Sequence, residues 1–528
     1  MDVVARSLKE AECRLKDIDD AISKGDSEIQ KFYQDSVIFI TGASGFMGKL
    51  LVEKLLRACN IKKIYILIRG KKGKTIRERL DDIKRDQVFD HLRETQPNFG
   101  HKIEGVEGDV AEIRLGISDH DLKTLKKEVD IIFHLAATTK FNMPLPAATL
   151  INIRGTREIL HLAKQCSKLR VFVYVSTAYC CATTDKIGVQ LEEEFHPCSI
   201  PPATLIDIVE KVDTARVEAI VPGLMESWPN TYTFTKAITE QLVRSMADEI
   251  PICVIRPPIV IGTYNEPAPG WVDMSCANGP SGIIIGHGLG ILRVMYTRED
   301  KLLCLVPGDY ANNCILAAAW DCVERRKSGD EDVKIFSVSS TKSGVQLRTL
   351  TKNLKQNDLK KYSPRQSIWY CQTYITDNKL LYHIFSWFMN YLPAMIVDLI
   401  INVFQIPKPK GITSFVTLYK KVDKLALAFR YFTCNGWRFN DKNIVELHQK
   451  MSPMDQKIFN VDTSTINWDH MIFIWFLGVK KFILKESKLI DDYAIRKQKV
   501  FKVANYAVFF IYLYVFYYIF YSLYSYFK

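Results

Sequence analysis

The sequence is poor in the features that mark secreted and metal-dependent proteins. It has 13 cysteines in 528 residues and no C-x-x-C pair, which is too few for a disulfide scaffold and favours a reduced, cytosol-facing protein. The ten histidines are scattered, without an H-E-x-x-H motif or a Cys/His cluster, so we expect no metal. The first 30 residues mix acidic and basic side chains without an apolar run, unlike a secretory signal peptide.

Charge and composition exclude further classes of protein. Lysine and arginine total 71 against 59 aspartates and glutamates, a net charge of +12, and 48% of the residues are hydrophobic. These values are ordinary for a globular protein and exclude disordered and collagen-like chains. At about 100–200 residues per domain, the length predicts roughly three structural units.

One long apolar run lies near the C-terminus. Residues 503–527 contain no charged side chain and exceed the roughly 20 residues that a membrane-spanning helix needs. A buried core helix is the alternative, because the run is rich in tyrosine, which prefers membrane interfaces. Basic residues precede the run and only Lys528 follows it, so the positive-inside rule places the preceding chain in the cytosol. The preceding basic residues are Lys480, Lys481, Lys485, Lys488, Arg496, Lys497, Lys499 and Lys502.

This basic flank accounts for part of the net charge, because cations beside a span are attracted to anionic lipid. Membrane lipid is therefore an expected partner and nucleic acid is not. A second apolar stretch, residues 384–406, contains Pro393 and Asp398 near its middle, which are costly in a lone membrane helix. We expect a helical hairpin or interfacial element that lines a lipid-facing tunnel, with a plain core helix as the alternative.

The first half of the chain alternates short buried strands with helices. β-Branched apolar runs occupy residues 36–41, 63–68, 131–135, 170–175 and 252–255, and residues 45–58 have helical spacing of their apolar side chains. This alternation predicts an α/β fold with a doubly wound parallel sheet of the Rossmann type.

A glycine-rich turn follows the first strand. Residues 41–48 read T-G-A-S-G-F-M-G. Such glycines allow a tight turn and let a pyrophosphate approach the backbone, and the following helix N-terminus supplies N–H groups and a positive dipole. A P-loop does not fit the spacing, and Leu50 stands where Ser or Thr would bind magnesium. The expected dinucleotide-binding residues are Thr41, Gly42, Ser44, Gly45, Phe46, Met47 and Gly48.

The residues after the second strand indicate which dinucleotide binds. An NAD site would have Asp or Glu there, whereas residues 69–72 read R-G-K-K, and cations favour the 2′-phosphate of NADPH. A solvated basic turn is the alternative. Turns after the third and fourth strands fit the adenine and the nicotinamide ribose of the same cofactor. The expected contacts are Arg69 and Lys72 with the phosphate, Asp109 and Val110 with the adenine, and Ala136 and Ala137 with the ribose.

The candidate chemistry lies in a Tyr-x-x-x-Lys motif. Tyr232 and Lys236 are four residues apart, so both project from one face of a helix. A phenol is a poor acid at neutral pH unless a nearby ammonium lowers its pKa, and Lys236 is spaced to do so. The strand ending at Ser176 and Thr177 offers a hydroxyl at the carboxyl edge of the sheet, where such folds bind ligands.

Taken together, the turn, the Ser/Thr strand and the Tyr-x-x-x-Lys helix resemble an extended short-chain dehydrogenase/reductase (SDR). Several phrases more closely resemble the fatty acyl-CoA reductases, over roughly residues 28–502. The segment 305–313 departs from that family, with glycine and alanine where valines are expected. The phrases are E-I-Q-K-F-Y at 28–33, L-I-R-G-K-K-G-K at 67–74, Y-V-S-T-A-Y at 174–179, I-R-P-P-I-V at 255–260, L-P-A at 392–394 and G-V-K-K-F at 478–482, with Trp468.

The resemblance implies four parts and a set of roles. The parts are an N-terminal helical extension (1–30), an NADP-binding reductase domain (31–343), a helical C-terminal module (344–502) and a transmembrane segment (503–527). It implies that Tyr232 is the acid and that Lys236 holds the ribose. Thr177 is the second hydroxyl donor, Ser176 is the less favoured choice, and the loop that includes Pro257 covers the nicotinamide.

The reaction that the resemblance implies is the NADPH-dependent reduction of a long-chain fatty acyl-CoA to a primary alcohol, by two hydride transfers through an aldehyde. The endoplasmic reticulum membrane is the expected location, with the catalytic domain in the cytosol and the peroxisomal membrane as the alternative. A membrane-bound 3-beta-hydroxysteroid dehydrogenase-like oxidoreductase and a catalytically inactive NADPH-binding membrane protein are the rival functions. Acyl chain length and self-association are not specified.

Overall fold

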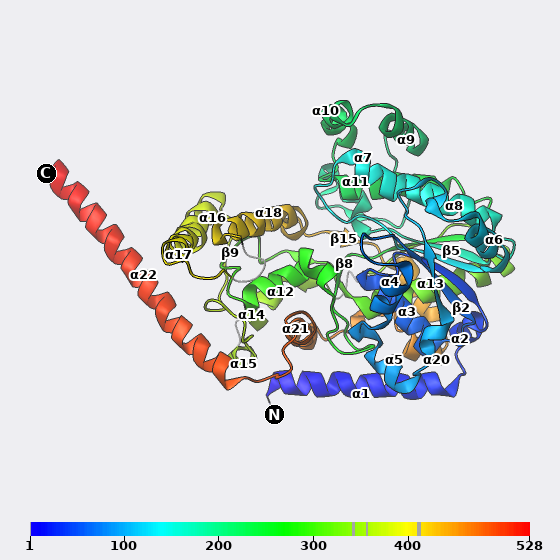
Figure 1. Cartoon of the computed structure of the whole chain (residues 1–528), viewed down its shortest axis with the longest axis horizontal. Helices are drawn as coiled ribbons and strands as arrows, with labels where there is room; N and C mark the ends of the chain where they lie inside the picture. Colours follow the sequence, from blue (N-terminus) through cyan, green and yellow to red (C-terminus); the bar gives the residue numbers. More distant parts are fainter. Residues whose placement is uncertain (1, 340–343, 355–356, 409–412) are drawn as a thin grey trace.

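The structure is a computed structural model that describes residues 2–339, 344–354, 357–408 and 413–528 (Figure 1). Its centre is a seven-stranded parallel sheet with the order β3-β2-β1-β4-β5-β7-β12, which confirms the predicted α/β fold. The chain starts in the middle and winds outward in both directions, as in Rossmann-type folds. The strands are β1 (Val37–Thr41), β2 (Lys63–Ile68), β3 (Ile103–Glu107), β4 (Ile131–His134), β5 (Val171–Val175), β7 (Ile252–Arg256) and β12 (Ile335–Ser337).

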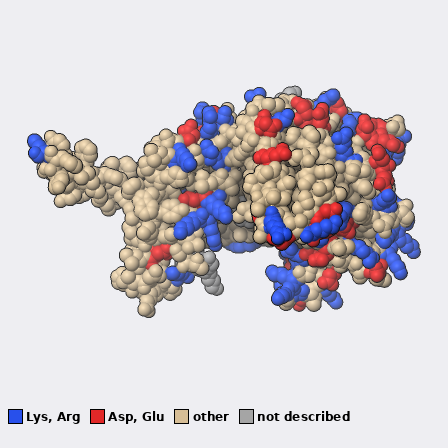
Figure 2. Space-filling model, turned by 90° about the horizontal axis from the view of Figure 1, so that it is seen from above, with Lys and Arg blue, Asp and Glu red and all other residues tan. Residues whose placement is uncertain are grey.

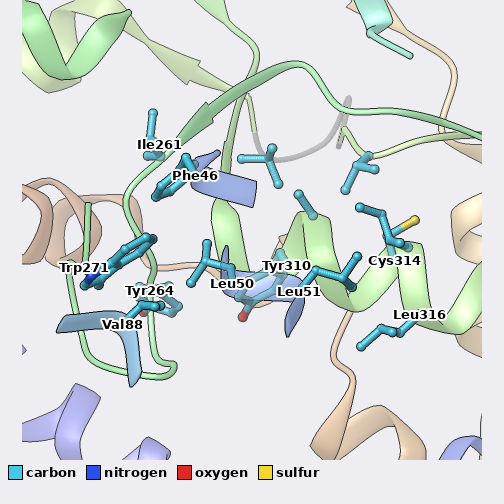
Figure 3. Close-up of a cluster of buried hydrophobic side chains, with 14 of the residues drawn as sticks. Phe46, Leu50, Leu51, Val88, Ile261, Tyr264, Trp271, Tyr310, Cys314 and Leu316 are labelled. Atoms are coloured by element: carbon cyan, nitrogen blue, oxygen red, sulfur yellow. The ribbon is translucent and has the colours of Figure 1, made fainter. Parts of the chain in front are cut away.

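The central strands are apolar along their whole length because helices cover both faces of the sheet. All five residues of β1 are buried. Ile38 and Ile40 point into one hydrophobic cluster with α3 (Phe46–Ala58) and α13 (Gly308–Lys327), and Phe39 points into a second with α6 (Asp119–Glu128) and α8 (Gly155–Gln165). Figure 3 shows part of the first cluster, where Leu50 and Leu51 of α3 meet Tyr310 and Cys314 of α13.

Gly308 lies at the closest approach of α13 to α3. A Cβ there would lie 2.7 Å from Leu50 Cδ1. Gly308 belongs to the segment 305–313, which differs from the family pattern. This segment forms the short strand β11 (Leu305–Pro307), which pairs with β8 (Ile259–Ile261), and the start of α13. The small residues therefore serve helix packing.

Of the remaining helices before the C-terminal part, α9 and α10 form a lobe at the top of Figure 1 and α1 runs along the bottom of the view. These remaining helices are α1 (Val3–Lys24), α2 (Glu28–Tyr33), α4 (Ile76–Lys84), α5 (Asp90–Thr95), α7 (Leu145–Thr149), α9 (Pro202–Lys211), α10 (Thr214–Met225), α11 (Thr231–Arg244) and α12 (Pro280–Gly288).

The C-terminal part is mostly helical and joins the sheet domain through short two-stranded pairings. Its strands pair with earlier strands of the chain: β13 (Val345–Gln346) with β10 (Leu302–Leu303), β14 (Tyr374–Thr376) with β9 (Val294–Tyr296), and β15 (Arg438–Phe439) with β6 (Gln190–Leu191). Its helices are α14 (Leu347–Leu354), α15 (Asn357–Lys360), α16 (Lys379–Ser386), α17 (Leu392–Val403), α18 (Phe415–Cys434), α19 (Lys442–Lys450), α20 (Pro453–Ile458), α21 (Trp468–Gly478) and α22 (Asp492–Phe527).

Two helices of this part are long and apolar enough to cross a membrane, Lys379–Val403 and Asp492–Phe527. The second is α22, which contains the predicted span and projects away from the body (Figure 1). Figure 2 shows the projecting helix as an almost uncharged surface, apart from its free end. Length, composition and exposure make both helices candidates for contact with a membrane.

Two glycines form the seam between α21 and the loop that follows β8. A Cβ on Gly478 would overlap the carbonyl oxygen of Gly270, so the two backbones are in direct contact. Next to this contact, Trp271 is buried and stacks on Phe46, with ring centroids 5.2 Å apart and an interplanar angle of 5°. The C-terminal part therefore supports the loop that reaches the glycine-rich turn.

Replacing Gly478 by alanine is expected to destabilise the protein by about 1–3 kcal/mol, because backbone atoms must move to admit the methyl group. Gly223→Ala is the matched control, since a Cβ there meets nothing within 4 Å. Thermal unfolding of the two variants in the same detergent checks this. An unchanged midpoint for Gly478→Ala would contradict the close seam.

Candidate active site

The glycine-rich turn leads from β1 into α3 at the carboxyl edge of the sheet. Gly42 has a φ of 77°, which favours glycine. A Cβ on Gly42 would lie 2.7 Å from the backbone nitrogen of Ala136, after β4. Gly48 has no room for a Cβ either, because the Gly42 carbonyl occupies that space. The structure thus brings together the turns around Gly42 and Ala136, which the sequence analysis assigned to one cofactor.

The start of α3 is suited to an anionic ligand. Its N-cap residue, Gly45, makes no side-chain cap hydrogen bond, and the first turn has no acidic residue. The N–H groups at this end are therefore left for a ligand, and the helix dipole favours a negative charge. Phe46 is buried against Trp271, whereas Met47 is partly buried and Ser44 is exposed. The residues present fit the pyrophosphate of a dinucleotide.

A buried histidine that the sequence analysis did not select holds the base of this turn. His134, the last residue of β4, makes hydrogen bonds through Nδ1 to Thr41 Oγ1 (2.6 Å) and through Nε2 to Thr156 Oγ1 (3.0 Å). Burial lowers the pKa of His134 to about 3, so the ring is neutral. Thr41 Oγ1 also accepts a bond from the Ala136 N–H (3.3 Å). The predicted Thr41 therefore connects the two turns.

The residues expected to select the cofactor lie on the surface beyond β2. The Arg69 side chain is 71% exposed, and its Nε lies 3.8 Å from Asp109 Oδ2, after β3. Lys72 is also exposed. Asp109 accepts a hydrogen bond from the Ala111 N–H (3.0 Å). The basic residues and the predicted adenine site are thus adjacent and open to a ligand.

Helix α11 carries the Tyr-x-x-x-Lys motif. Asn230 caps it by accepting a hydrogen bond from the Thr233 N–H (3.0 Å). The Lys236 ammonium donates to the Val175 carbonyl (2.7 Å) and to Tyr174 Oη (3.3 Å), both on β5. Lys236 is therefore directed at the end of the strand that leads to Thr177.

Thr177 and Tyr232 interact at the carboxyl end of β5. Burial raises the pKa of Tyr232 to about 12, and a hydrogen bond with the Thr177 side chain opposes that rise. Thr177 Oγ1 also donates weakly to the carbonyl of Pro257 (3.4 Å), which receives the Ala178 N–H as well (2.9 Å). The two hydroxyls expected to bind a carbonyl oxygen thus lie together.

Ser176 differs from its neighbour. Its hydroxyl is buried and has no hydrogen-bond partner among the described residues, and its backbone N–H donates to the Ile255 carbonyl (2.8 Å). A buried hydroxyl without a partner is unusual in folded proteins. It is available to a ligand at the edge of the sheet.

Lys236 is supported by a buried ion pair one turn further along α11. Burial lowers the pKa of Lys236 to about 8, and the negative charge of Glu240 works in the opposite direction. Glu240 forms a bidentate pair with Arg256 of β7, with distances of 2.6 and 3.0 Å. Both side chains are at most 2% exposed. The pair fixes α11 to the sheet beside the motif.

Activity is expected to fall as pH rises through about 8. Below this pH Lys236 is an ammonium, and above it the lysine loses the charge with which it would hold an anionic or hydroxyl-bearing ligand. The pH profile of kcat/KM measures this. Lys236→Arg should move the alkaline limb upward if it retains activity, because guanidinium stays protonated. A wild-type profile that stays flat past pH 9 (roughly one unit above the expected pKa) would contradict the assignment.

Asn152 is a second residue that the sequence analysis missed. It is buried in the π-helical segment Leu150–Arg154, donates to Thr235 Oγ1 (2.9 Å) and accepts from the Thr138 N–H (2.9 Å). It therefore links the loop after Ala136 and Ala137 to the middle of the Tyr-x-x-x-Lys motif. π-Helical turns often occur at functional sites.

Aromatic side chains surround Tyr232 on the side of the C-terminal module. Phe141 lies 6.1 Å from the Tyr232 ring, and it contacts Phe429 (5.7 Å) and Phe432 (5.3 Å) of α18. The two modules therefore meet at the candidate acid, in apolar surroundings.

The parallel sheet, its glycine-rich turn and its Tyr–Lys helix define a nicotinamide-dependent oxidoreductase of the SDR type. Two family models match the chain, both described as male sterility protein: an NAD-binding domain over residues 40–315 and a Sterile domain over residues 389–486. Fatty acyl-CoA reductase wat of Drosophila melanogaster is 32% identical over 490 residues, covering 93% of this chain and 92% of that protein. Fatty acyl-CoA reductase 1 of Xenopus laevis is 35% identical over 469 residues, 87% of each chain. The chain belongs to the fatty acyl-CoA reductase family, which confirms the resemblance.

A solved structure shares the fold at lower identity. The terminal R domain of the myxalamid PKS-NRPS biosynthetic pathway has a TM-score of 0.57 at 18% identity, covering 84% of this chain and 91% of that domain. The shared architecture extends over most of the chain, including much of the part that follows the sheet domain.

Proposed function

We propose that this protein reduces long-chain fatty acyl-CoA to a primary fatty alcohol with NADPH, by two hydride transfers through an aldehyde. The carrying observation is the Tyr-x-x-x-Lys helix α11 held against the end of β5, where the Lys236 ammonium binds the carbonyl of Val175, two residues before Thr177, in a chain related along most of its length to fatty acyl-CoA reductases. Bound NADPH would supply the hydride for each reduction.

The chain's own groups would act on the carbonyl oxygen. Tyr232 and Thr177 donate hydrogen bonds to the oxyanion that forms when the thioester carbonyl is reduced. The intermediate collapses to the aldehyde as the CoA thiolate leaves. In the second reduction, Tyr232 gives its proton to the alkoxide, which yields the alcohol. Phe141 covers part of the Tyr232 ring, and an apolar neighbour strengthens such hydrogen bonds by lowering the local dielectric constant.

The cofactor would lie across the carboxyl edge of the sheet. We propose that the turn 41–48 holds its pyrophosphate, Arg69 and Lys72 its 2′-phosphate, and Asp109 and Val110 its adenine. Ala136, Ala137 and Pro257 would border the nicotinamide end, and Lys236 would hold the ribose. The uncapped N-terminus of α3 and the orphaned Ser176 hydroxyl support a ligand at this edge.

We propose that α22 anchors the protein in the endoplasmic reticulum membrane, or alternatively the peroxisomal membrane, with the reductase domain in the cytosol. The uncharged run of Val503–Phe527 and the basic residues before it support this orientation. An apolar substrate and product suit a membrane-bound enzyme, because each buried CH₂ contributes about 0.8 kcal/mol.

Arg69→Glu is expected to lower the preference for NADPH over NADH by about 10–100-fold, since a hydrogen bond to a charged group contributes about 1.5–3 kcal/mol. The glutamate repels the 2′-phosphate and can accept a ribose hydroxyl. Arg77→Glu, with the same charge change at another exposed position, is the control. The ratio of the two kcat/KM values measures the preference, and an unchanged ratio in Arg69→Glu refutes the phosphate assignment.

The detergent-solubilised protein and a series of acyl-CoAs test the function. We expect two NADPH to be consumed for each fatty alcohol identified by mass spectrometry. NADPH binding without consumption would favour an inactive cofactor-binding protein. Oxidation of a hydroxysteroid with NAD would favour the steroid dehydrogenase.

A further inference from the structure

The helix before α18 presents an apolar face that the rest of the described chain leaves uncovered. α16, the π-helical segment Trp387–Tyr391 and α17 follow one another without a break. Large apolar side chains on this helix and just after it are between 47% and 72% exposed: Leu380, Trp387, Met395, Leu399, Val403 and Phe404. Met395, Leu399 and Val403 recur every four residues, so they lie on one face.

The opposite face of the same helix carries polar side chains that contact α18. Tyr382 and Tyr391 donate hydrogen bonds to Asp423 of α18, at 3.0 and 2.7 Å. Asp398 caps α18 by accepting from the Phe415 N–H (2.9 Å) and the Ser414 hydroxyl (2.7 Å). The two helices thus form a hairpin in which Asp398 and Asp423 accept hydrogen bonds from within the hairpin, as an element in contact with hydrocarbon requires of its charged groups.

The second helix of this hairpin, α18, indicates how the hairpin lies relative to the bilayer. Lys420, Lys421 and Lys424 of α18 are all exposed. Three lysines in the hydrocarbon core are costly, so the hairpin cannot cross the bilayer. An apolar face on one helix and cations on the other are typical of an element that lies in the membrane interface.

The anchor helix sets the depth of the hairpin. Tyr512 of α22 donates to the Phe388 carbonyl (2.9 Å), and the Phe388 ring contacts Tyr512 and Phe516. Tyr512 follows Lys502, the last basic residue before the run, by ten positions. At 1.5 Å per residue this is about 15 Å along the helix. If Lys502 lies at the headgroups, Phe388 and its neighbour Trp387 lie among the acyl chains.

We propose that the α16–α17 face is a second membrane-binding surface, submerged in the cytosolic leaflet beside α22. This inference rests on the proposed membrane insertion of α22. The bilayer is the occupant because the surface is continuous with the anchor helix and is uncharged. The protein is thus held by a span and by an interfacial helix, and α18 connects that helix to Phe141 and Tyr232.

Tryptophan fluorescence of the full-length protein in phosphatidylcholine vesicles tests this placement. All eight tryptophans lie in the described residues, and Trp387 is the exposed one among them. We expect lipid brominated near the middle of its acyl chains to quench the wild type, and Trp387→Phe to lose most of that quenching. Trp320→Phe, on α13 of the reductase domain, is the matched control and should keep it.

The remaining outcomes overturn the proposal. Equal bromolipid quenching in wild type and Trp387→Phe means that Trp387 is not in lipid. Quenching of Trp387 by aqueous iodide places the face in water, and quenching by neither agent means that protein, such as a second copy, covers it. Failure of the protein to float with the vesicles overturns the α22 anchor as well. NADPH consumption in detergent is measured separately, so failure of the reductase function is distinguishable.

Discussion

Replacing Tyr232 by phenylalanine is expected to lower kcat for acyl-CoA reduction by about 10²–10⁴-fold, the usual contribution of a general acid. The variant keeps the ring that contacts Phe141 but removes the hydroxyl that pairs with Thr177. NADPH binding should be unchanged in equilibrium titration. Product formation under single-turnover conditions separates a chemical defect from slow product release.

Tyr33→Phe is the matched control for this change. Tyr33 is buried and its hydroxyl donates to the Leu316 carbonyl (2.9 Å), but it precedes β1 and therefore lies toward the amino edge of the sheet. Its loss should reduce stability without reducing kcat. If Tyr232→Phe retained activity within a few-fold of the wild type, another group would have to be the acid.

Glu240→Gln is expected to destabilise the protein by about 3–5 kcal/mol, because it leaves the buried Arg256 guanidinium without its charge partner. The same change removes the negative charge that keeps the pKa of Lys236 from falling further. The alkaline limb of the pH profile should therefore move below that of the wild type. Thermal unfolding and the pH profile of kcat/KM measure the two effects.

Asp207→Asn removes the acidic partner of an exposed pair, with Lys211, in which the side chains are 60% and 72% exposed. Its effect on stability should stay within about 0.5 kcal/mol. A similarly small effect for Glu240→Gln would show that the buried pair does not fix α11. A large loss of stability without a shift of the alkaline limb would show that Glu240 does not influence the pKa of Lys236.

The sequence was most informative where local residues determine the structure. In the turn from β1 to α3, the positive φ of Gly42 and the Gly42 carbonyl that fills the space beside Gly48 are local reasons for glycine, and the predicted sheet is observed. The i, i+4 spacing of Tyr232 and Lys236 likewise follows from helical geometry. These predictions required no knowledge of distant contacts.

The missed residues depend on partners far away in the chain. Asn152 makes a hydrogen bond to Thr235, and His134 makes one to Thr41. Neither pair has a sequence signature. The π-helical turn around Asn152 also has no simple pattern of residues. The sequence analysis expected Lys236 to lower the pKa of Tyr232, whereas burial raises that pKa to about 12 and the Lys236 ammonium binds Val175 and Tyr174 of β5.

The apolar stretch 384–406 shows why an ambiguous pattern can be resolved only in three dimensions. Pro393 directly follows the π-helical segment of the continuous helix, and such local π-helical turns let a helix accommodate a residue without an N–H. Asp398 is satisfied by the start of α18, across a loop. A hairpin within residues 384–406 is wrong, because residues 384–403 belong to one continuous helix, Lys379–Val403, that packs against α18; Pro393 and Asp398 are both accommodated in it.

The glycine seam between residues 270 and 478 has a consequence for how reductases of this kind can diversify. A side chain on Gly478 would overlap the Gly270 carbonyl oxygen, and one on Gly270 would overlap the Ile474 carbonyl oxygen, so neither glycine can be replaced unless the two backbones move apart. A chimaera that exchanges residues 344–502 between relatives replaces the α21 side of this contact and keeps the Gly270 side. Trp271, which stacks on Phe46, lies next to the contact. New substrate ranges would therefore arise more readily by substitutions inside a module than by recombination between modules.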